Sequence, residues 1–140
     1  AMPESRFGWL VLLFLLTGMN DSAQAWWGRR LGSRPLAPRL SPAKTWEGLW
    51  GGLVTTVLVS TLASPALTSV GRGEAAAFGL VVALAGTAGD LAASALKRRA
   101  GVKDSGAVVP GHGGVLDRFD SLAATAPVTF VVALVVGLRP

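Results

Sequence analysis

A glycine-rich stretch flanked by basic residues contains the residues best suited to chemistry. It runs from Lys97 to Asp120 and reads KRRAGVKDSGAVVPGHGGVLDRFD. Glycine turns expose backbone N–H groups that bind phosphate oxygens, and neighbouring Lys and Arg side chains offset the phosphate charge. Asp117 and Asp120 share a face if a helix begins there, and carboxylate oxygens are ligands that Mg²⁺ prefers. The stretch therefore has the composition of a metal–phosphate site, although charged, turn-rich loops without a ligand are also common.

Two further carboxylates lie inside apolar segments. Asp21 and Asp90 stand in stretches that otherwise look membrane-spanning. An ionisable residue at mid-helix in a membrane costs about 2.5–3.5 kcal/mol, so such residues usually have a function. Asp90, Ser94 and Lys97 are spaced to share one helix face. An Asp90–Lys97 pair reaching toward water explains this spacing equally well, so both interpretations stay open.

A third motif, SPAKTWEG at 41–48, precedes an apolar segment. Ser41 is a good N-cap and Pro42 suits the first helical position, so the motif predicts a helix that starts here. The free N–H groups of its first turn would bind an anion beside Lys44. Taken alone this signal is weak, because most Ser-Pro helix starts only cap a helix.

Composition limits the chemistry and the class of protein. Of 140 residues, 51% are hydrophobic and only 15% are charged, against about 25% charged in typical soluble domains. The mean hydropathy is +0.51. These values argue against a disordered chain and against a soluble nucleic-acid binder, despite the net charge of +5, so we expect no nucleic-acid partner. With no Cys and one His, the chain has no thiol nucleophile and no Cys- or His-based metal cluster of its own.

Four apolar segments must position these residues. Each approaches the roughly 20 helical residues that cross a bilayer core, and they cover about 8–27, 47–64, 75–96 and 121–138. Polar loops at 28–46 and 97–120 and a turn at 65–74 connect them. The pattern predicts an all-α, polytopic membrane protein with about four transmembrane helices, two long cytoplasmic loops and a single membrane-embedded domain over 1–140.

Charge sets the expected orientation. Ten of the 13 Lys and Arg residues lie in the two long loops, namely Arg29, Arg30, Arg34, Arg39, Lys44, Lys97, Arg98, Arg99, Lys103 and Arg118. The positive-inside rule then places both loops in the cytoplasm. Six of the eight carboxylates gather on the same side. We therefore expect a multi-pass protein of the inner cell membrane with its active site facing the cytoplasm.

The first segment has a second interpretation. Arg6, an apolar run at 9–16 and the Ala-Gln-Ala sequence at 23–25 together resemble a secretory signal with its cleavage site. Asn20 and Asp21 just before that site, and two Trp residues just after it, weaken the match.

Together the motifs closely resemble the signature of the phosphatidate cytidylyltransferases, also called CDP-diacylglycerol synthases. The resemblance rests on S-x-L-K-R-x4-K-D-x-G-x3-P-x-H-G-G-V-x-D-R-F-D over 94–120, on the 41–52 block, on Gly89-Asp90, and on Asp21-Ser22-Ala23 followed by Gly28-Arg29. Departures from the family pattern are small: Val109 replaces a larger residue, and Gln24-Ala25 replaces Ala-Tyr. None of them removes a charged group.

The resemblance implies transfer of CMP from CTP to phosphatidate, giving CDP-diacylglycerol and pyrophosphate. It implies catalysis by Asp90, Lys97 and Asp117, and Mg²⁺, with or without a second cation, held by Asp90, Asp117 and Asp120. The substrate-binding residues that it implies are Asp21, Ser41, Pro42, Lys44, Arg98, Lys103, His112 and Arg118. For Arg98, Lys103 and Arg118 the alternative is anchoring to an anionic leaflet, and for His112 it is shaping the Gly turn.

The resemblance also implies partners. These are CTP, phosphatidate, membrane lipid and a second copy of the chain in a homodimer. The family's bacterial members are about twice as long, and this chain resembles their C-terminal half. Helices that precede residue 1, a minimal member, or a bundle built jointly by two chains would each account for the length. Two alternatives to phosphatidate transfer are a cytidylyltransferase for another lipid phosphate and a truncated, non-catalytic membrane fragment.

Overall fold

Four long helices and one short hairpin make up the described part of the chain. The computed structural model describes residues 6–101 and 115–137, the side chains of 115–118 and of 137 excepted. In chain order the elements are α1 (Arg6–Leu31), β1 (Pro35–Ala37), β2 (Ser41–Thr45), α2 (Trp46–Leu67), α3 (Arg72–Arg99) and α4 (Val115–Gly137). Each predicted apolar segment is therefore helical over its described residues, and each helix begins before the first residue of its apolar segment.

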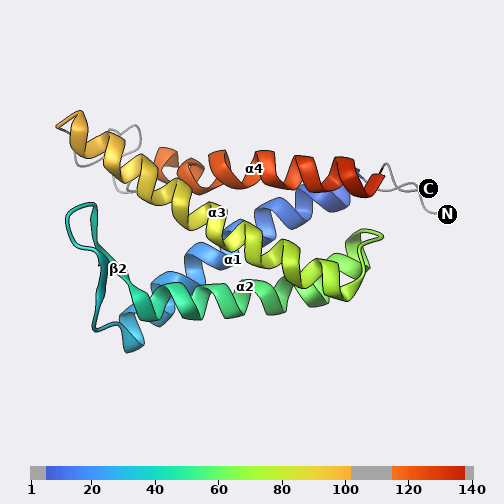
Figure 1. The fold of residues 1–140 in the computed structure, drawn as a ribbon, viewed down its shortest axis with the longest axis horizontal. Helices are drawn as coiled ribbons and strands as arrows, with labels where there is room; N and C mark the ends of the chain where they lie inside the picture. The colour runs from blue at the N-terminus through green and yellow to red at the C-terminus, as the bar shows by residue number, and fades with distance from the viewer. Residues whose placement is uncertain (1–5, 102–114, 138–140) are drawn as a thin grey trace.

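The helices lie side by side along the long axis of the molecule (Figure 1). α1 contacts all three other helices, and the other main helix contacts join α2 to α3 and α3 to α4. α1 begins and α4 ends at one end of the bundle, whereas the β1–β2 hairpin lies at the opposite end, which we call the hairpin end. Because successive helices run in opposite directions, the last turns of α3 meet the hairpin and the first turns of α4 there.

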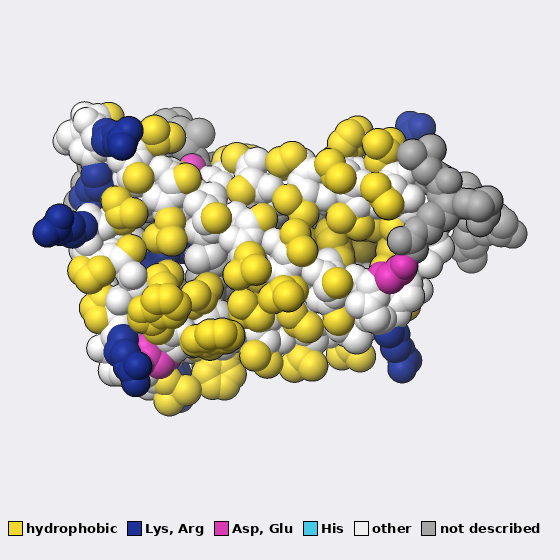
Figure 2. Space-filling model, viewed as in Figure 1, with side chains coloured by type: hydrophobic (Ala, Val, Ile, Leu, Met, Phe, Trp, Pro, Cys, Tyr) yellow, Lys and Arg dark blue, Asp and Glu magenta, His cyan; other side chains and the backbone are white. Residues whose placement is uncertain are grey.

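α2 and α4 turn small and polar residues toward the interior of the bundle. α2 buries every fourth residue, and all five are small: Gly48, Gly52, Thr56, Ser60 and Ser64. α4 repeats the pattern with Ser121, Thr125 and Thr129. The large apolar side chains of α2 point outward, including Trp50, Val54, Leu58 and Leu62. Figure 2 shows an apolar band across the middle of one face, with Lys and Arg at both ends. Small residues inside and large apolar residues outside are typical of helices that pack within a membrane.

Hydroxyl groups join the helices across this polar interior. The Ser60 hydroxyl of α2 donates to the Ala75 carbonyl oxygen of α3 at 2.6 Å. The Thr17 and Thr125 hydroxyls join α1 to α4 at 2.9 Å. Among the described residues, no buried side-chain nitrogen or oxygen lacks a partner. Interhelical hydrogen bonds of this kind contribute about 0.6 kcal/mol each in a membrane, so they mainly fix how the helices align.

Apolar side chains close the end opposite the hairpin. Trp9, Leu12 and Leu16 of α1 pack with Phe78 and Val82 of α3. The Trp9 and Phe78 rings meet edge to face with their centroids 5.8 Å apart. This packing leaves the hairpin end as the region where charged side chains of several helices can gather.

Three of the described helices are long and apolar enough to cross a membrane: α2, α3 and the part of α4 from Phe119 to Val136. α1 has the length but is not among them, because Asn20, Asp21 and Gln24 interrupt its apolar sequence. The predicted all-α membrane protein therefore fits the structure, while the crossing of α1 stays a prediction.

The hairpin is the one element that the sequence analysis did not predict. Residues 41–45 were expected to open a helix, but they form strand β2, which pairs antiparallel with β1 and sets Ser41 opposite Ala37. A turn connects the strands, with Leu40 N donating to Ala37 O at 3.1 Å. Pro38 stands at the second position of this turn, where its fixed φ is favourable.

The N-cap of α2 therefore lies four residues later than the Ser41 N-cap that the SPAKTWEG motif predicted. α2 begins at Trp46, and Thr45 is its N-cap, with Oγ1 accepting a hydrogen bond from Gly48 N at 3.1 Å. Both Ser41 and Thr45 are suitable cap residues, and strand pairing holds the backbone extended as far as Thr45. Pro42 is tolerated because a two-stranded hairpin consists only of edge strands.

Candidate active site

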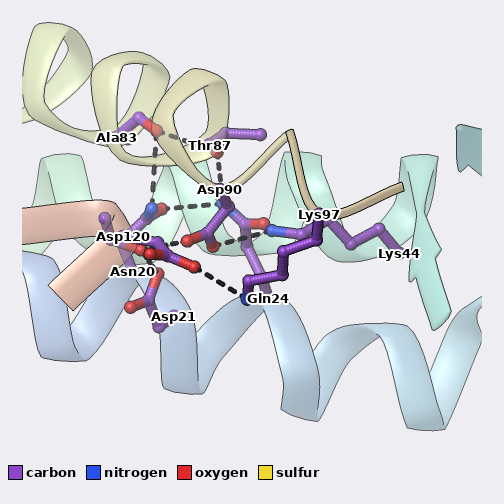
Figure 3. A network of polar contacts seen from close by, with 10 residues as sticks. Asn20, Asp21, Gln24, Lys44, Ala83, Thr87, Asp90, Lys97 and Asp120 are labelled. Atoms are coloured by element: carbon purple, nitrogen blue, oxygen red, sulfur yellow. Dashed lines mark hydrogen bonds and ion pairs between the residues drawn. The ribbon is translucent and has the colours of Figure 1, made fainter. Parts of the chain in front are cut away.

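Asp90 stands at the centre of a polar cluster at the hairpin end (Figure 3). Its Oδ2 pairs with Nζ of Lys44 from β2 at 2.8 Å. Its Oδ1 accepts a hydrogen bond from the Ser121 hydroxyl of α4 at 2.6 Å. The Lys44 and Asp90 side chains are 21% and 20% exposed. The pair is thus largely withdrawn from water yet still open to a ligand.

Asp21 of α1 meets the same hydroxyl. Ser121 Oγ lies 3.1 Å from Asp21 Oδ1. Since a hydroxyl carries a single hydrogen, Ser121 cannot donate fully to both carboxylates at once. α1 and α3 therefore hold two carboxylates beside each other around one hydroxyl, with Lys44 as a neighbouring cation.

A second ion pair borders this cluster. Lys97, in the last turn of α3, places Nζ 3.1 Å from Oδ2 of Asp120 on α4, and the two side chains are 18% and 23% exposed. Asp120 directly precedes Ser121. The first turns of α4 thus bring both ion pairs into one site.

Close packing of α3 on α4 sets this register. A Cβ on Gly89 would lie 2.6 Å from the Ala124 Cβ and 2.9 Å from the Asp120 carbonyl oxygen. No larger residue fits there without a shift of one helix. Since Asp90 follows Gly89 and Ser121 follows Asp120, this contact places the Asp90 carboxylate opposite the Ser121 hydroxyl.

A layer of amides supports the site from the bundle interior. The Gln24 side-chain amide of α1 donates to Asn20 Oδ1 at 3.1 Å and to Thr87 Oγ1 of α3 at 2.6 Å. Asn20 Nδ2 donates to the Ala83 carbonyl oxygen at 3.4 Å, and Asn20 is 1% exposed. These bonds tie α1 to α3 within one turn of Asp21 and within two turns of Asp90, as Figure 3 shows.

Glu47 fixes the hairpin to α2. Its carboxylate accepts hydrogen bonds from the Ser33 hydroxyl at 2.8 Å, from Ser33 N at 3.2 Å and from Arg34 N at 3.3 Å. These donors lie between α1 and β1, while Glu47 stands in the first turn of α2. Glu47 therefore closes the segment that carries Lys44 and limits where Lys44 can reach.

A cavity of about 250 Å³ opens beside these groups. It is lined by Asp21, Gln24, Ala25, Ser41, Ala43, Lys44, Thr45, Gly48, Leu49 and Asp90. Its walls thus come from α1, the hairpin, α2 and α3. The cavity offers one lysine, two carboxylates and two hydroxyls to a bound molecule.

The structure brings together many of the predicted site residues. Asp21, Ser41, Lys44 and Asp90 line the cavity, and Lys97 and Asp120 form the neighbouring pair. Pro42 and Arg98 are exposed and do not line it. Lys103, His112 and the side chains of Asp117 and Arg118 lie outside the described part. The backbone of α4 begins at Val115, so Asp117 and Asp120 stand one helical turn apart, as expected.

Sequence reasoning missed three contributors, namely Ser121, Gln24 and the clamp formed by Glu47. Ser121 begins the buried repeat of hydroxyl residues on α4, and this period of four was the available signal. Gln24 stands one turn after Asn20, so the two amides share a face of α1. Glu47 had no readable signal, because its partners Ser33 and Arg34 belong to a loop of irregular structure.

This arrangement can bind a cation and a phosphate together. Two adjacent carboxylates with one lysine leave an excess of negative charge, and their hard oxygens suit Mg²⁺. Lys44 and Lys97 can offset phosphate charge. Among the described residues no three carboxylates come together, so a fuller ligand set would need the Asp117 side chain.

The sequence model of the cytidylyltransferase family matches residues 2–136 of this chain. The chain belongs to the cytidylyltransferase family. The match includes every described residue of the cluster around Asp90. It also includes the 102–114 segment, where the glycine-rich part of the sequence signature lies.

Several curated proteins are similar in sequence to this chain. The uncharacterized protein YnbB of Escherichia coli is 50% identical over 125 residues, which are 88% of this chain and 42% of the relative. The phosphatidate cytidylyltransferase of Haemophilus influenzae is 41% identical over 123 residues, or 84% of this chain and 43% of the relative. The phosphatidate cytidylyltransferase of Rickettsia felis is 38% identical over 139 residues, which cover 94% of this chain and 61% of the relative. The chain thus spans about half the length of the curated relatives it matches.

Proposed function

We propose that the chain forms the catalytic part of a membrane enzyme that transfers CMP from CTP to phosphatidate. The products are CDP-diacylglycerol and pyrophosphate. One observation carries the proposal: Asp90 is held between Lys44 and Ser121 and lies beside Asp21, at the basic end of a bundle with an apolar surface. Family membership and the names of two relatives support the same reaction.

The chemistry asks for positioning more than for proton transfer. A phosphate oxygen of phosphatidate forms a bond to the α-phosphorus of CTP, the bond from that phosphorus to the β-phosphate oxygen breaks, and pyrophosphate leaves. The second pKa of a phosphate monoester is about 6, so the nucleophile is mostly dianionic near neutral pH and needs no general base. The protein must hold two anions in line and offset their charge, and Lys44 and Lys97 are suited to this.

Mg²⁺ is part of the proposal. Asp90, with Asp21, Asp120 or Asp117 as partners, would hold the ion, and a second cation in the same acidic cluster is compatible with this ligand set. When bound, Mg²⁺ neutralises charge on the substrate phosphates. Around it, Ser121 orients the Asp90 and Asp21 carboxylates, and Lys44 limits the net negative charge of the site.

We further propose that α1 crosses the membrane as a fourth span and that the hairpin end faces the cytoplasm of the cell, at its inner membrane. Eight described cations support this orientation, because they belong to the hairpin end: Arg29, Arg30, Arg34, Arg39, Lys44, Lys97, Arg98 and Arg99. Soluble CTP and a lipid phosphate of the cytoplasmic leaflet can meet at such a site. A homodimer belongs to the same proposal, and light scattering of the purified chain in detergent measures it.

A transfer assay tests the function. The purified chain, Mg²⁺, phosphatidate and CTP labelled in its α-phosphate should yield label in the organic phase. Asp90→Asn and Asp117→Ala should each abolish this transfer. The control is Glu74→Gln, which neutralises a carboxylate at the opposite end of the bundle and should leave the transfer rate within about twofold of that of the unmodified chain.

Two other results of the transfer assay would change the proposal. Label that appears only with an isoprenoid glycerol phosphate would replace phosphatidate by that substrate. No transfer by this chain, together with transfer by a version extended at its N-terminus, would contradict an independent catalytic part and favour the fragment interpretation.

A further inference from the structure

A second cavity, of about 390 Å³, lies between α1 and α4. Its lining includes Phe14, Gly18, Asp21, Ser22 and Ala25 of α1 and Leu122 of α4. In Figure 1, α1 and α4 lie close to each other where α1 begins and diverge toward the hairpin end. We call this cavity the α1–α4 groove.

The groove is continuous with the candidate active site. Asp21 and Ala25 line both the groove and the 250 Å³ cavity beside Lys44. One turn of α1 therefore separates a space that contains Lys44 and Asp90 from a space that extends along the side of the bundle. A molecule with its head beside Lys44 can pass this turn and continue into the groove.

The polarity of the lining changes along α1. Asp21 and Ser22 are polar and lie nearer the hairpin end, whereas Gly18 and Phe14 follow one and two turns deeper into the apolar band. The hydroxyl of Thr17, in the same wall, is already bonded to Thr125. The groove thus offers a polar mouth and an apolar interior, which matches a molecule with a charged head and a hydrocarbon tail.

Size decides what fits the groove. From Phe14 to Ala25, α1 rises roughly 16 Å at 1.5 Å per residue, so a volume of 390 Å³ corresponds to a mean cross-section of roughly 25 Å². The groove therefore has room for one extended hydrocarbon chain.

Gly18 leaves part of this space open. It is exposed, and a Cβ built on it would meet no atom within 4 Å. A larger side chain at this position would therefore extend into the groove without disturbing the packing of the bundle.

We propose that the α1–α4 groove holds an acyl chain of the lipid phosphate and that Gly18 determines whether that chain fits. This inference rests on the proposed function, since the lipid is the substrate assigned there. Leu122 forms the opposite wall, and the turn at Asp21 and Ala25 separates the lipid tail from the reacting phosphates.

Photolabelling tests the groove directly. Phosphatidate with a diazirine in one acyl chain is added to the protein in phosphatidylcholine vesicles, and the adducts are located on the protein by mass spectrometry. We expect them on residues 14–25 and near Leu122, with competition from unlabelled phosphatidate. Gly18→Leu should reduce this labelling by about tenfold, since added methylene groups occupy the site. Ala77→Leu, at an exposed position of α3, should change it by no more than about twofold.

Turnover in the same vesicles separates this inference from the proposed function. Gly18→Leu should lower kcat/KM for phosphatidate by about tenfold, while the KM for CTP stays within about twofold. The acyl-chain site would be wrong, and the proposed function would stand, if the enzyme turned over but the adducts were spread evenly over the lipid-facing helices. The same conclusion would follow if a phosphatidylcholine probe labelled the groove equally. If the groove were protected from the probe only when the protein is a dimer, its occupant would be a second copy of the chain, and the acyl-chain site would again be wrong. Labelling of the groove without turnover would contradict the proposed function and leave lipid-phosphate binding in place.

Discussion

The Ser121 hydroxyl contacts two carboxylates but has one hydrogen to share between them. It therefore fixes how far apart Asp21 and Asp90 stand without neutralising either. A water molecule could replace the hydrogen bond, but it would not hold α4 against α1 and α3. The position of this one oxygen links three helices at the point where their carboxylates meet.

We expect Ser121→Ala to lower transfer activity by about 10–100-fold, the usual loss when a group that orients metal ligands is removed. The apparent Mg²⁺ requirement should rise at the same time, because the two carboxylates lose their common partner. Titration of the rate with Mg²⁺ measures both effects. Ser64→Ala is the matched control, since Ser64 is an equally buried serine in the part of α2 that lies far from the hairpin end. Equal losses in the two variants would show that Ser121 only stabilises the fold.

At the scale of elements, the hairpin depends on Glu47. Without the carboxylate, Ser33 and Arg34 lose three hydrogen bonds, and the segment before β1 loses its attachment to α2. We expect Glu47→Ala to accelerate tryptic cleavage after Arg39 and to lower activity by releasing Lys44. Glu47→Gln keeps one acceptor oxygen, so its cleavage rate should lie between those of the unmodified protein and Glu47→Ala. Unchanged cleavage in Glu47→Ala would show that the strands hold the hairpin by themselves.

The contact of α3 with α4 gives a second prediction at this scale. Gly89→Ala should destabilise the bundle by about 1–3 kcal/mol, because overpacking forces the helices apart, and it should lower activity by moving Asp90 away from Ser121. Thermal unfolding in detergent and the transfer assay measure the two effects. Gly73→Ala is the control: a Cβ there meets no atom within 4 Å. Equal unfolding temperatures for the two variants would contradict the close packing at Gly89.

The elements differ in how readable they were from the sequence. The four helices could be predicted, because an apolar run of some 20 residues leaves few alternatives. The hairpin could not, since β1 has three residues and Ser41-Pro42 is equally suited to a helix start. Asp21, Lys44 and Asp90 were identified one by one from their chemistry. Their meeting through Ser121 could not be predicted, because it depends on the axial positions of α1, α3 and α4.

At the scale of the whole molecule, orientation in the membrane can be measured. Because the chain has no Cys, single-cysteine variants report on one position each. We expect a membrane-impermeant maleimide added to intact cells to label Gly71→Cys, in the link between α2 and α3, and not Arg39→Cys, in the hairpin turn. Inverted vesicles should show the reverse. Labelling of both variants from one side would contradict the proposed crossing of α2.

The inward-facing hydroxyls and glycines of α2 and α4 have a consequence for temperature. The heat capacity of unfolding comes mainly from apolar surface that becomes exposed to water. When these helices separate within a bilayer, their large apolar side chains stay in contact with lipid, and the newly exposed groups are mostly small and polar. The heat-capacity change should therefore be small, and the free energy of helix separation should vary almost linearly with temperature. Such a protein would have no maximum of stability near ambient temperature and would not undergo cold denaturation.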